Sequence, residues 1–325
     1  MRKLLLGTTA LAAAATISAN AALADVSISG SYEFKYLSRS SNDTTVDGTS
    51  FAHGDSEMIV NFSSKTDSGL TLGYRYDFTA VSSDAMAHTA DENSLSISGG
   101  FGKIVLGVDD DAADSYNIDE MDLIAEEPTA GTTNSSIRRN SATASSDAMK
   151  VAYHMPAMGG LTAGAAFTDG GEEGNADTTE FGAGYSMEAA GASVYLSYVT
   201  GSTENSTQDI DSSAIGVKIA TGDVTFVIGQ SQYEAENDDE QGTSAAVKFN
   251  VNDGLTLAAY TGEVEDDISG EEYSNSGAEL IYTIASGLKA IVTIEDYDYK
   301  KGTGSGAGLV DDSGTHSKLT MKATF

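Results

Sequence analysis

The stretch SKLTMKATF (residues 317–325) alternates between apolar and polar side chains up to the last residue of the chain. One face of the predicted strand carries Leu319, Met321, Ala323 and Phe325, and the other carries Lys318, Thr320, Lys322 and Thr324. Chain ends are usually polar and poorly ordered. A strand that keeps its pattern to the final residue is therefore expected to have a structural task, such as closing a sheet so that no edge is left unpaired.

The same period of two recurs along almost the whole chain, whereas a helical period is hard to find. Clear examples are VSISGSYEFKY (26–36), LTLGYRYDF (70–78) and LKAIVTIED (288–296). Seven tight turns with glycine or Asn/Asp join predicted strands into hairpins, and longer polar loops such as YEAENDDEQG (233–242) lie between the hairpins. Together with a first strand at 25–37 and a last strand at 315–325, these hairpins predict sixteen strands.

Strands of about ten alternating residues, with short turns at one end and long loops at the other, are typical of an outer-membrane β-barrel. The nine basic residues within predicted strands all fall on the polar face: Lys35, Arg75, Lys103, Lys150, Lys218, Lys248, Lys289, Lys318 and Lys322. Because charge facing lipid is costly, the apolar face is predicted to meet lipid and the polar face to line the lumen. A barrel of this size is too wide for side chains to fill, which leaves an aqueous channel. The expected fold is thus an all-β, transmembrane, antiparallel 16-stranded β-barrel over residues 25–325.

The first 24 residues are expected to be a secretory signal peptide. Arg2 and Lys3 precede a mostly apolar run, and Ala22-Leu23-Ala24 provides a small-x-small cleavage signal. The whole chain holds 17 Lys and Arg against 49 Asp and Glu, and it has no cysteine. Such an acidic chain excludes nucleic acid as a partner, because phosphate binding needs basic residues. Disulfides and thiolate metal sites are excluded as well.

One loop, at about 109–146, is much longer than the others, and loops of this length are usually functional or disordered. Its apolar residues Ile118, Met121, Leu123 and Ile124 favour packing against protein over exposure to water. We therefore expect this third loop to fold into the barrel and narrow the channel. An outward acidic loop that contacts a neighbouring subunit or lipopolysaccharide is the alternative. The acidic side of the predicted constriction is Asp109, Asp110, Asp111, Asp114, Asp119, Glu120, Asp122, Glu126 and Glu127.

The opposite side of the predicted constriction is basic. Its members are Lys35, Arg75, Lys318 and Lys322, from the first, third and last strands, together with Arg138 and Arg139 late in the loop. Opposite charges across a narrow passage of low dielectric constant set up a transverse field that favours polar over apolar solutes. Each of these side chains could instead form an ordinary ion pair in the lumen.

No cofactor is needed for passive diffusion. The acidic stretches DDDAAD (109–114), EAENDDE (234–240) and EVEDD (263–267) are candidates for structural calcium, since carboxylate oxygens are calcium ligands. None has the spacing of an EF-hand loop, so solvated loops, or divalent ions that bridge to lipopolysaccharide phosphates, are the favoured interpretation. The four histidines are scattered, and no Gly-x-Ser-x-Gly motif is present, so the sequence singles out no catalytic site.

Several motifs together resemble a known family. These are the signal peptide, GLTLGYRYDF (69–78), SISGGFGKIVLGVDD (96–110), SSDAMKVAYHMPAMGGLTAGAAF (145–167) and the terminal phenylalanine. The chain resembles the general diffusion porins of Gram-negative bacteria, most closely those of alphaproteobacteria. The resemblance implies a homotrimer of sixteen-stranded barrels with the third loop folded inward. It also implies that Phe325 is part of the signal read by the barrel-assembly machinery.

The chain departs from better-known members of that family in two ways. Its third loop has AEEPTAG (125–131) where they have a Pro-Glu-Phe-Gly-Gly segment, and its opposite wall has fewer arginines. The acidic excess favours cations. We therefore expect a non-enzymatic outer-membrane porin for small hydrophilic solutes and ions, with outer-membrane lipid and lipopolysaccharide around it. The alternative is a substrate-specific channel, which would show an aromatic path in the lumen, where Tyr195 and Tyr260 are the predicted exceptions to lipid-facing aromatics. A barrel enzyme, an adhesin or a secreted acidic β-protein are more distant alternatives.

Overall fold

The computed structural model describes residues 25–42, 47–54, 56–81, 87–110, 112–126, 128, 148–170, 176–204, 209–302 and 310–325. The predicted signal peptide (1–24) lies outside the described residues. So do four predicted constriction residues: Asp111, Glu127, Arg138 and Arg139.

The described chain is almost entirely antiparallel sheet. The strands are β1 (Asp25–Ser41), β2 (Gly48–His53), β3 (Glu57–Lys65), β4 (Thr71–Val81), β5 (Ala87–Gly99), β6 (Gly102–Asp109), β7 (Ala148–His154), β8 (Leu161–Thr168), β9 (Asp177–Ala189), β10 (Ala192–Glu204), β11 (Asp209–Thr221), β12 (Val224–Ala235), β13 (Asp238–Asn252), β14 (Leu255–Asp266), β15 (Glu271–Ala285), β16 (Leu288–Lys300) and β17 (Asp312–Thr324). Two three-residue 3₁₀ helices, η1 (Asp114–Tyr116) and η2 (Glu120–Asp122), follow β6. The described part of the chain contains no helix long and apolar enough to cross a membrane.

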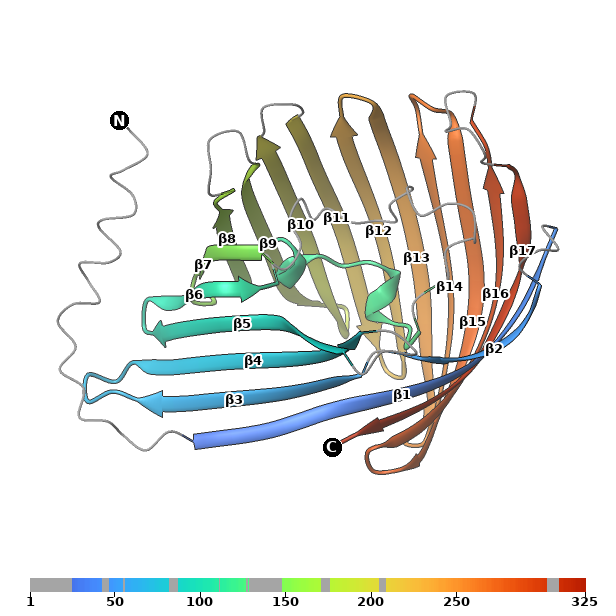
Figure 1. Ribbon diagram of the computed structural model, residues 1–325. Helices are drawn as coiled ribbons and strands as arrows, with labels where there is room; N and C mark the ends of the chain where they lie inside the picture. Colours follow the sequence, from blue (N-terminus) through green and yellow to red (C-terminus); the bar gives the residue numbers. More distant parts are fainter. Residues whose placement is uncertain are drawn as a thin grey trace.

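The sheet closes on itself, because β17 pairs with β1 from Ser31↔Thr324 to Ser41↔Gly314 (Figure 1). The backbone of Phe325 extends this pairing, since its N–H donates to the Gly30 carbonyl at 2.9 Å. The seventeen strand segments occupy sixteen positions in the ring. Both β2 and β3 pair with β1, at residues 34–39 and 25–31 respectively, so they are two halves of one interrupted strand. The predicted sixteen-stranded barrel is confirmed, with a first strand that runs on to Ser41.

The two faces of the wall are separated as predicted. Tyr32, Phe34 and Tyr36 of β1 are about two-fifths exposed on the outside, whereas Glu33 between them is 2% exposed. On β16 the exposed Val292 and Ile294 likewise alternate with fully buried inward residues. A water-soluble fold would bury these large apolar side chains, so an outer face of this kind is suited to lipid.

Candidate functional site

After β6 the described residues 112–126 lie inside the ring (Figure 1). Over residues 112–126, here called the inner segment, η1 contacts β9 and β10, and η2 contacts β12, β13 and β14. The Asp119 side chain accepts from the Met121 N–H, and the Asp122 side chain accepts from the Asp119 N–H. This reciprocal capping box fixes the first turn of η2 and therefore the direction of its side chains.

Apolar side chains dock the inner segment on the wall. Ile118 and Leu123 are 5% and 2% exposed, and they pack with Val227, Ala246 and Tyr260 on the inner faces of β12, β13 and β14. Ile124 lies at the edge of this cluster, whereas Met121 is 37% exposed and takes no part in it. Burying Leu and Ile in this way contributes roughly 1.5–3 kcal/mol for each side chain.

A second apolar contact holds η1, where Tyr116 packs with Val199 and Ala214. Two wall glycines make room for it. A Cβ on Gly182 would lie 2.5 Å from Tyr116 Cδ2, and a Cβ on Gly216 would lie 2.4 Å from the Ile118 carbonyl oxygen. At these two positions a side chain on the wall would collide with the inner segment. The two glycines therefore allow the inner segment to pack directly on the backbone of the wall.

The far end of the inner segment is bound through its backbone. The N–H groups of Ala125 and Glu126 donate to the two carboxylate oxygens of Glu279 on β15, at 2.7 and 3.0 Å. Glu279 is 3% exposed and also accepts from Thr293 Oγ1 at 3.1 Å. Three donors to one buried carboxylate form a strong anchor, because hydrogen bonds to a charged acceptor are stronger than those between neutral groups.

Two carboxylates of the inner segment pair with lysines of the wall. Glu126 binds Lys35 Nζ at 2.9 Å, and Asp122 binds Lys218 Nζ at 3.2 Å. Lys218 on β11 is absent from the predicted basic wall, although its inward direction follows from the alternation. These pairs tie the inner segment to two well-separated positions of the barrel, β1 and β11.

Asp119 lies between other carboxylates of the inner segment. Partial burial, together with the charges of Glu120 and Asp122, raises the pKa of Asp119 to about 7. A carboxyl with such a pKa changes its charge close to neutral pH. Asp114 lies at the start of η1 and is exposed.

Most of the predicted basic wall is already paired with acids of the wall itself. Arg75 contacts Asp77 at 2.9 Å and Glu92 at 2.6 Å, and Lys318 lies 4.0 Å from Glu295. In the pairs of β1 and β17, Glu33 binds both Lys35 at 3.2 Å and Lys322 at 2.5 Å. Of these four bases, Lys35 is the one whose ion pairs, among the described residues, include the inner segment. The acids could have been found from the sequence, because Glu33-x-Lys35 and Arg75-x-Asp77 are spaced two apart and share a face.

Asp109 and Asp110, at the start of the loop, meet the wall. The carboxylate oxygens of Glu92, Asp109 and Asp110 lie within 4.8 Å of one another, and Ser94 Oγ donates to Asp109. Carboxylate oxygens are the donors that calcium prefers, and two of the three residues, Asp109 and Asp110, belong to the first of the predicted calcium stretches.

The inward tyrosines are more numerous than expected. Besides Tyr195 and Tyr260, the inner faces of β15 and β16 carry Tyr273, Tyr297 and Tyr299, which pack together and are at most 6% exposed. The expectation that inward aromatics are confined to two positions is therefore wrong. It fails because these long strands extend beyond the apolar outer band, where alternation no longer distinguishes the lipid face.

Comparison with known proteins connects this arrangement to one family. The family model for Gram-negative porins matches residues 7–302. No individually curated protein shows significant sequence similarity to the chain. Similar solved structures include the trimer form of the outer membrane protein OmpT of Vibrio cholerae (16% identity, TM-score 0.70, 93% of this chain and 99% of that chain). Others are the anion-selective porin of Comamonas acidovorans (13%, TM-score 0.70, 93% and 100%) and the outer membrane channel DcaP of Acinetobacter baumannii (10%, TM-score 0.68, 93% and 97%).

Proposed function

The chain belongs to the Gram-negative porin family, and from that premise we propose that it forms a water-filled pore for passive diffusion of small hydrophilic solutes and ions. Membership of this family confirms the resemblance to Gram-negative porins, and the protein is an outer-membrane β-barrel channel. The closer resemblance to the porins of alphaproteobacteria stays a prediction. Diffusion without catalysis and ion selectivity are inferred from the arrangement of the lumen, and assembly is inferred by analogy with a similar structure.

The docking of the inner segment carries the proposal. Its apolar side chains and the Glu279 anchor bind it to the wall from β9 to β15. The charged pairs lie on another part of the wall, around Lys35 of β1, Arg75 of β4 and Lys318 of β17. The passage then runs between the inner segment and this charged part of the wall. A constriction bounded by charged and hydrogen-bonding groups passes hydrated solutes and disfavours apolar ones.

We infer a preference for cations from the charges at this passage. The bases of the wall are offset by Glu33, Asp77, Glu92 and Glu295, so they leave little net positive charge. The described acids of the loop outnumber their lysine partners; they are Asp109, Asp110, Asp114, Asp119, Glu120, Asp122 and Glu126. The remaining negative potential concentrates cations in the passage. The anion-selective Comamonas porin shares the fold at 13% identity. The fold therefore does not set ion selectivity, which depends on the individual side chains.

We also propose a homotrimer, by analogy with the trimer form of the Vibrio OmpT. Lipopolysaccharide and outer-membrane lipid are the surroundings that the apolar outer face requires. Phe325, which is 83% exposed beside the closing β1–β17 pair, is proposed as part of the signal for the barrel-assembly machinery. The described residues suggest no enzymatic role, and no cofactor enters the proposal.

A substrate-specific channel is the second candidate, because inward tyrosines could form a path for one solute. Tyr273, Tyr297 and Tyr299 pack on one another, however, and expose at most 6% of their surface. Rings that are buried in this way do not offer their faces to a passing molecule, which favours general diffusion.

Conductance in a planar bilayer tests the proposal. Protein extracted in detergent without heating is expected to insert and give discrete conductance steps that close in thirds. Under a salt gradient the reversal potential is expected to have the sign of a cation-selective pore. Folded protein that inserts and conducts nothing would overturn the diffusion proposal, and an anion-selective sign would overturn the inferred preference alone.

A further inference from the structure

Three acids of the inner segment differ in how they are neutralised. Asp122 pairs with Lys218 and Glu126 with Lys35, whereas Glu120 has no ion pair with any described residue. Glu120 is nevertheless 2% exposed, and its Oε2 has no hydrogen-bond partner within the described part of the chain. A buried carboxylate without a partner is costly, since it has lost its hydration and gained nothing in return.

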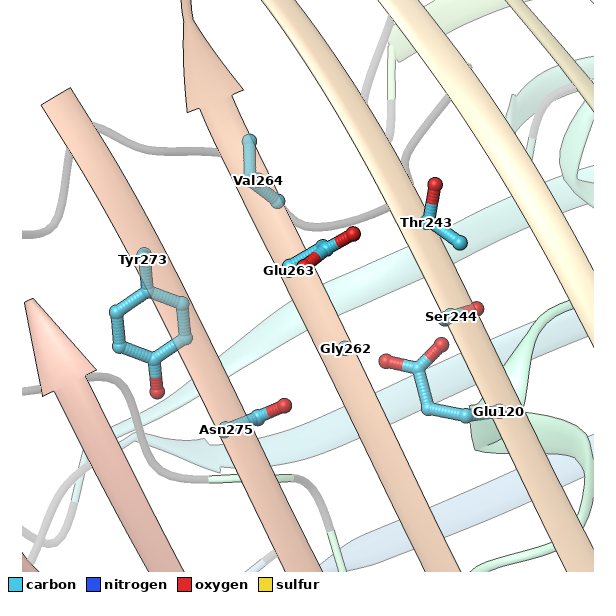
Figure 2. Close-up of a pocket in the computed structure, with 8 residues that line it drawn as sticks. All are labelled: Glu120, Thr243, Ser244, Gly262, Glu263, Val264, Tyr273 and Asn275. Atoms are coloured by element: carbon cyan, nitrogen blue, oxygen red, sulfur yellow. The ribbon is translucent and has the colours of Figure 1, made fainter. Parts of the chain in front are cut away.

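Glu120 points into a small cavity between the inner segment and the wall. Figure 2 shows its side chain rising from the loop toward Ser244 on β13, Gly262 on β14 and Asn275 on β15. Tyr273 lies further along β15 at the same cavity. The cavity volume is about 10 Å³, roughly the space that a single water molecule occupies. It is too small for a fully hydrated ion and large enough for one bare ion or one water.

The Asn275 amide is turned so that its oxygen faces this cavity. Its Nδ2 donates to Glu295 Oε1 at 3.3 Å, which directs Oδ1 to the other side. A Cβ built on Gly262 would lie 3.1 Å from Asn275 Oδ1 and 3.8 Å from Glu120 Oε1. Both oxygens therefore lie within 4 Å of one point above Gly262. Neither a carboxylate oxygen nor an amide oxygen can donate a hydrogen bond. A cation or a hydrogen-bond donor placed near both oxygens would therefore satisfy them.

We propose that Glu120 and Asn275 bind a small, partly dehydrated cation of the size class of Na⁺ and Ca²⁺, over Gly262. Carboxylate and amide oxygens are the ligands these ions prefer, and a hydroxyl at Ser244 lines the same space. The ion gives Glu120 the positive partner that Asp122 has in Lys218 and that Glu126 has in Lys35. It fastens η2 to β13–β15, between the Lys218 and Glu279 contacts.

This site goes beyond the proposed function, because the ion is held and does not permeate. It also does not depend on the selectivity of the pore. A glycine at position 262 suits this site, since a Cβ there would lie 3.1 Å from Asn275 Oδ1 and 3.8 Å from Glu120 Oε1.

The test uses the folded, detergent-solubilised protein freed of metal ions. Thermal unfolding is measured in choline chloride, NaCl and CaCl₂ at equal ionic strength, and Ca²⁺ is then titrated to obtain an affinity. We expect the wild type to unfold at a higher temperature with Na⁺ or Ca²⁺ than with choline. In Glu120→Gln this cation-specific shift is lost and the affinity falls more than about tenfold. Asp114→Asn is the control, because that acid lies in the same inner segment, is exposed and does not belong to η2, and it should keep the shift.

Gly262→Ala removes no ligand and fills the cavity with one methyl group. Because the backbone at Gly262 is not in the left-handed region, alanine fits its conformation, and the barrel is expected to fold. The cation-specific shift should be lost or strongly reduced in this variant too. As a direct readout, Tb³⁺ serves as a Ca²⁺ analogue. Its emission on tyrosine excitation should decrease by the same amount in Glu120→Gln and Gly262→Ala, since Tyr273 lines the cavity.

Equal responses to choline, Na⁺ and Ca²⁺ in the wild type would overturn the proposal, and a proton or a water would then occupy the point between the oxygens. A cation-specific shift that survives in Glu120→Gln would overturn it as well, by moving the site elsewhere. Conductance of the same preparation separates the two proposals. A conducting pore without the cation shift contradicts only this site.

Discussion

The barrel wall has two parts with opposite inner faces. From β9 to β14 most inward positions described above as meeting the inner segment are apolar or glycine, as at Val199, Gly216 and Val227, and Lys218 is the charged exception. On β1, β4 and β17 the inward positions are acids and bases in contact, such as Glu33 with Lys322 and Arg75 with Asp77. Both parts alternate equally well and both turn apolar residues outward. The inner face, not the outer one, therefore separates the wall that holds the loop from the wall that bounds the passage.

The largest expected effect comes from breaking the docking part. Leu123→Ala leaves a cavity against Val227 and Ala246, which should lower the free energy of unfolding by about 2–5 kcal/mol. It should also raise single-channel conductance, because an inner segment that leaves its docked position narrows the passage less. Urea titration in lipid vesicles and bilayer recording measure the two effects. Met121→Ala, two residues away and 37% exposed, should change neither. Equal effects of both variants would contradict the docking.

The anchor at Glu279 gives a smaller change. Glu279→Gln replaces one acceptor oxygen with a donor, so at least one of the N–H groups of Ala125 and Glu126 loses its partner. A buried donor left unpaired costs about 1–3 kcal/mol. We expect more frequent spontaneous closures in single-channel recordings, with normal trimer yield. Glu272→Gln, on the exposed outer face of β15, is the control. Unchanged gating in Glu279→Gln would show that the backbone contact does not hold the segment.

On the charged part of the wall, Lys35→Met should change the ion selectivity of the passage. It removes the base that lies 3.2 Å from Glu33 and 2.9 Å from Glu126, so the passage becomes more negative. One unit charge about 4 Å from a solute ion contributes ~1 kcal/mol in water, which predicts up to roughly a fivefold rise in the cation-to-anion permeability ratio. Reversal potentials measure the ratio. Lys300→Met, exposed on the outer face, should leave the ratio unchanged, and the same rise in both variants would refute a local effect.

The smallest effect is a pH dependence from Asp119. Its pKa is raised to about 7 by burial and by Glu120, so the carboxyl is charged at pH 8 and mostly neutral at pH 6. Cation preference should fall modestly, by less than about twofold, between these pH values. The sign for stability follows, because the folded state binds this proton more tightly than the unfolded chain. Stability should therefore rise as pH falls through 7. Asp119→Asn should abolish the step in selectivity, whereas Asp114→Asn, at an exposed position, should retain it.

Much of this architecture is predictable from local pattern. Within the apolar outer band, alternation alone assigns the outward face of each strand. The apolar residues Ile118, Leu123 and Ile124 indicate that the long loop packs on protein. Alternation does not show where along the barrel axis a residue lies. Lys218 could not be matched to Asp122, since their meeting depends on how far η2 extends across the lumen. The part of the wall that binds the inner segment can, however, be recognised in the sequence. Val199 and Val227 are apolar residues at inward positions, and such interruptions of the polar face mark where the loop lies.

The join between β1 and β17 also determines how the molecule can be made. Ser41 Oγ donates to Asp312 Oδ1 across 271 residues of chain, within a seam that runs from residue 31 to residue 41 of β1. Until that seam forms, every partly built molecule presents two unpaired strand edges, which can pair with other chains. Contacts of such long sequence separation form late and slowly. Closure of the barrel is thus expected late in folding, and a delay in delivering β17 leaves these two edges open to aggregation.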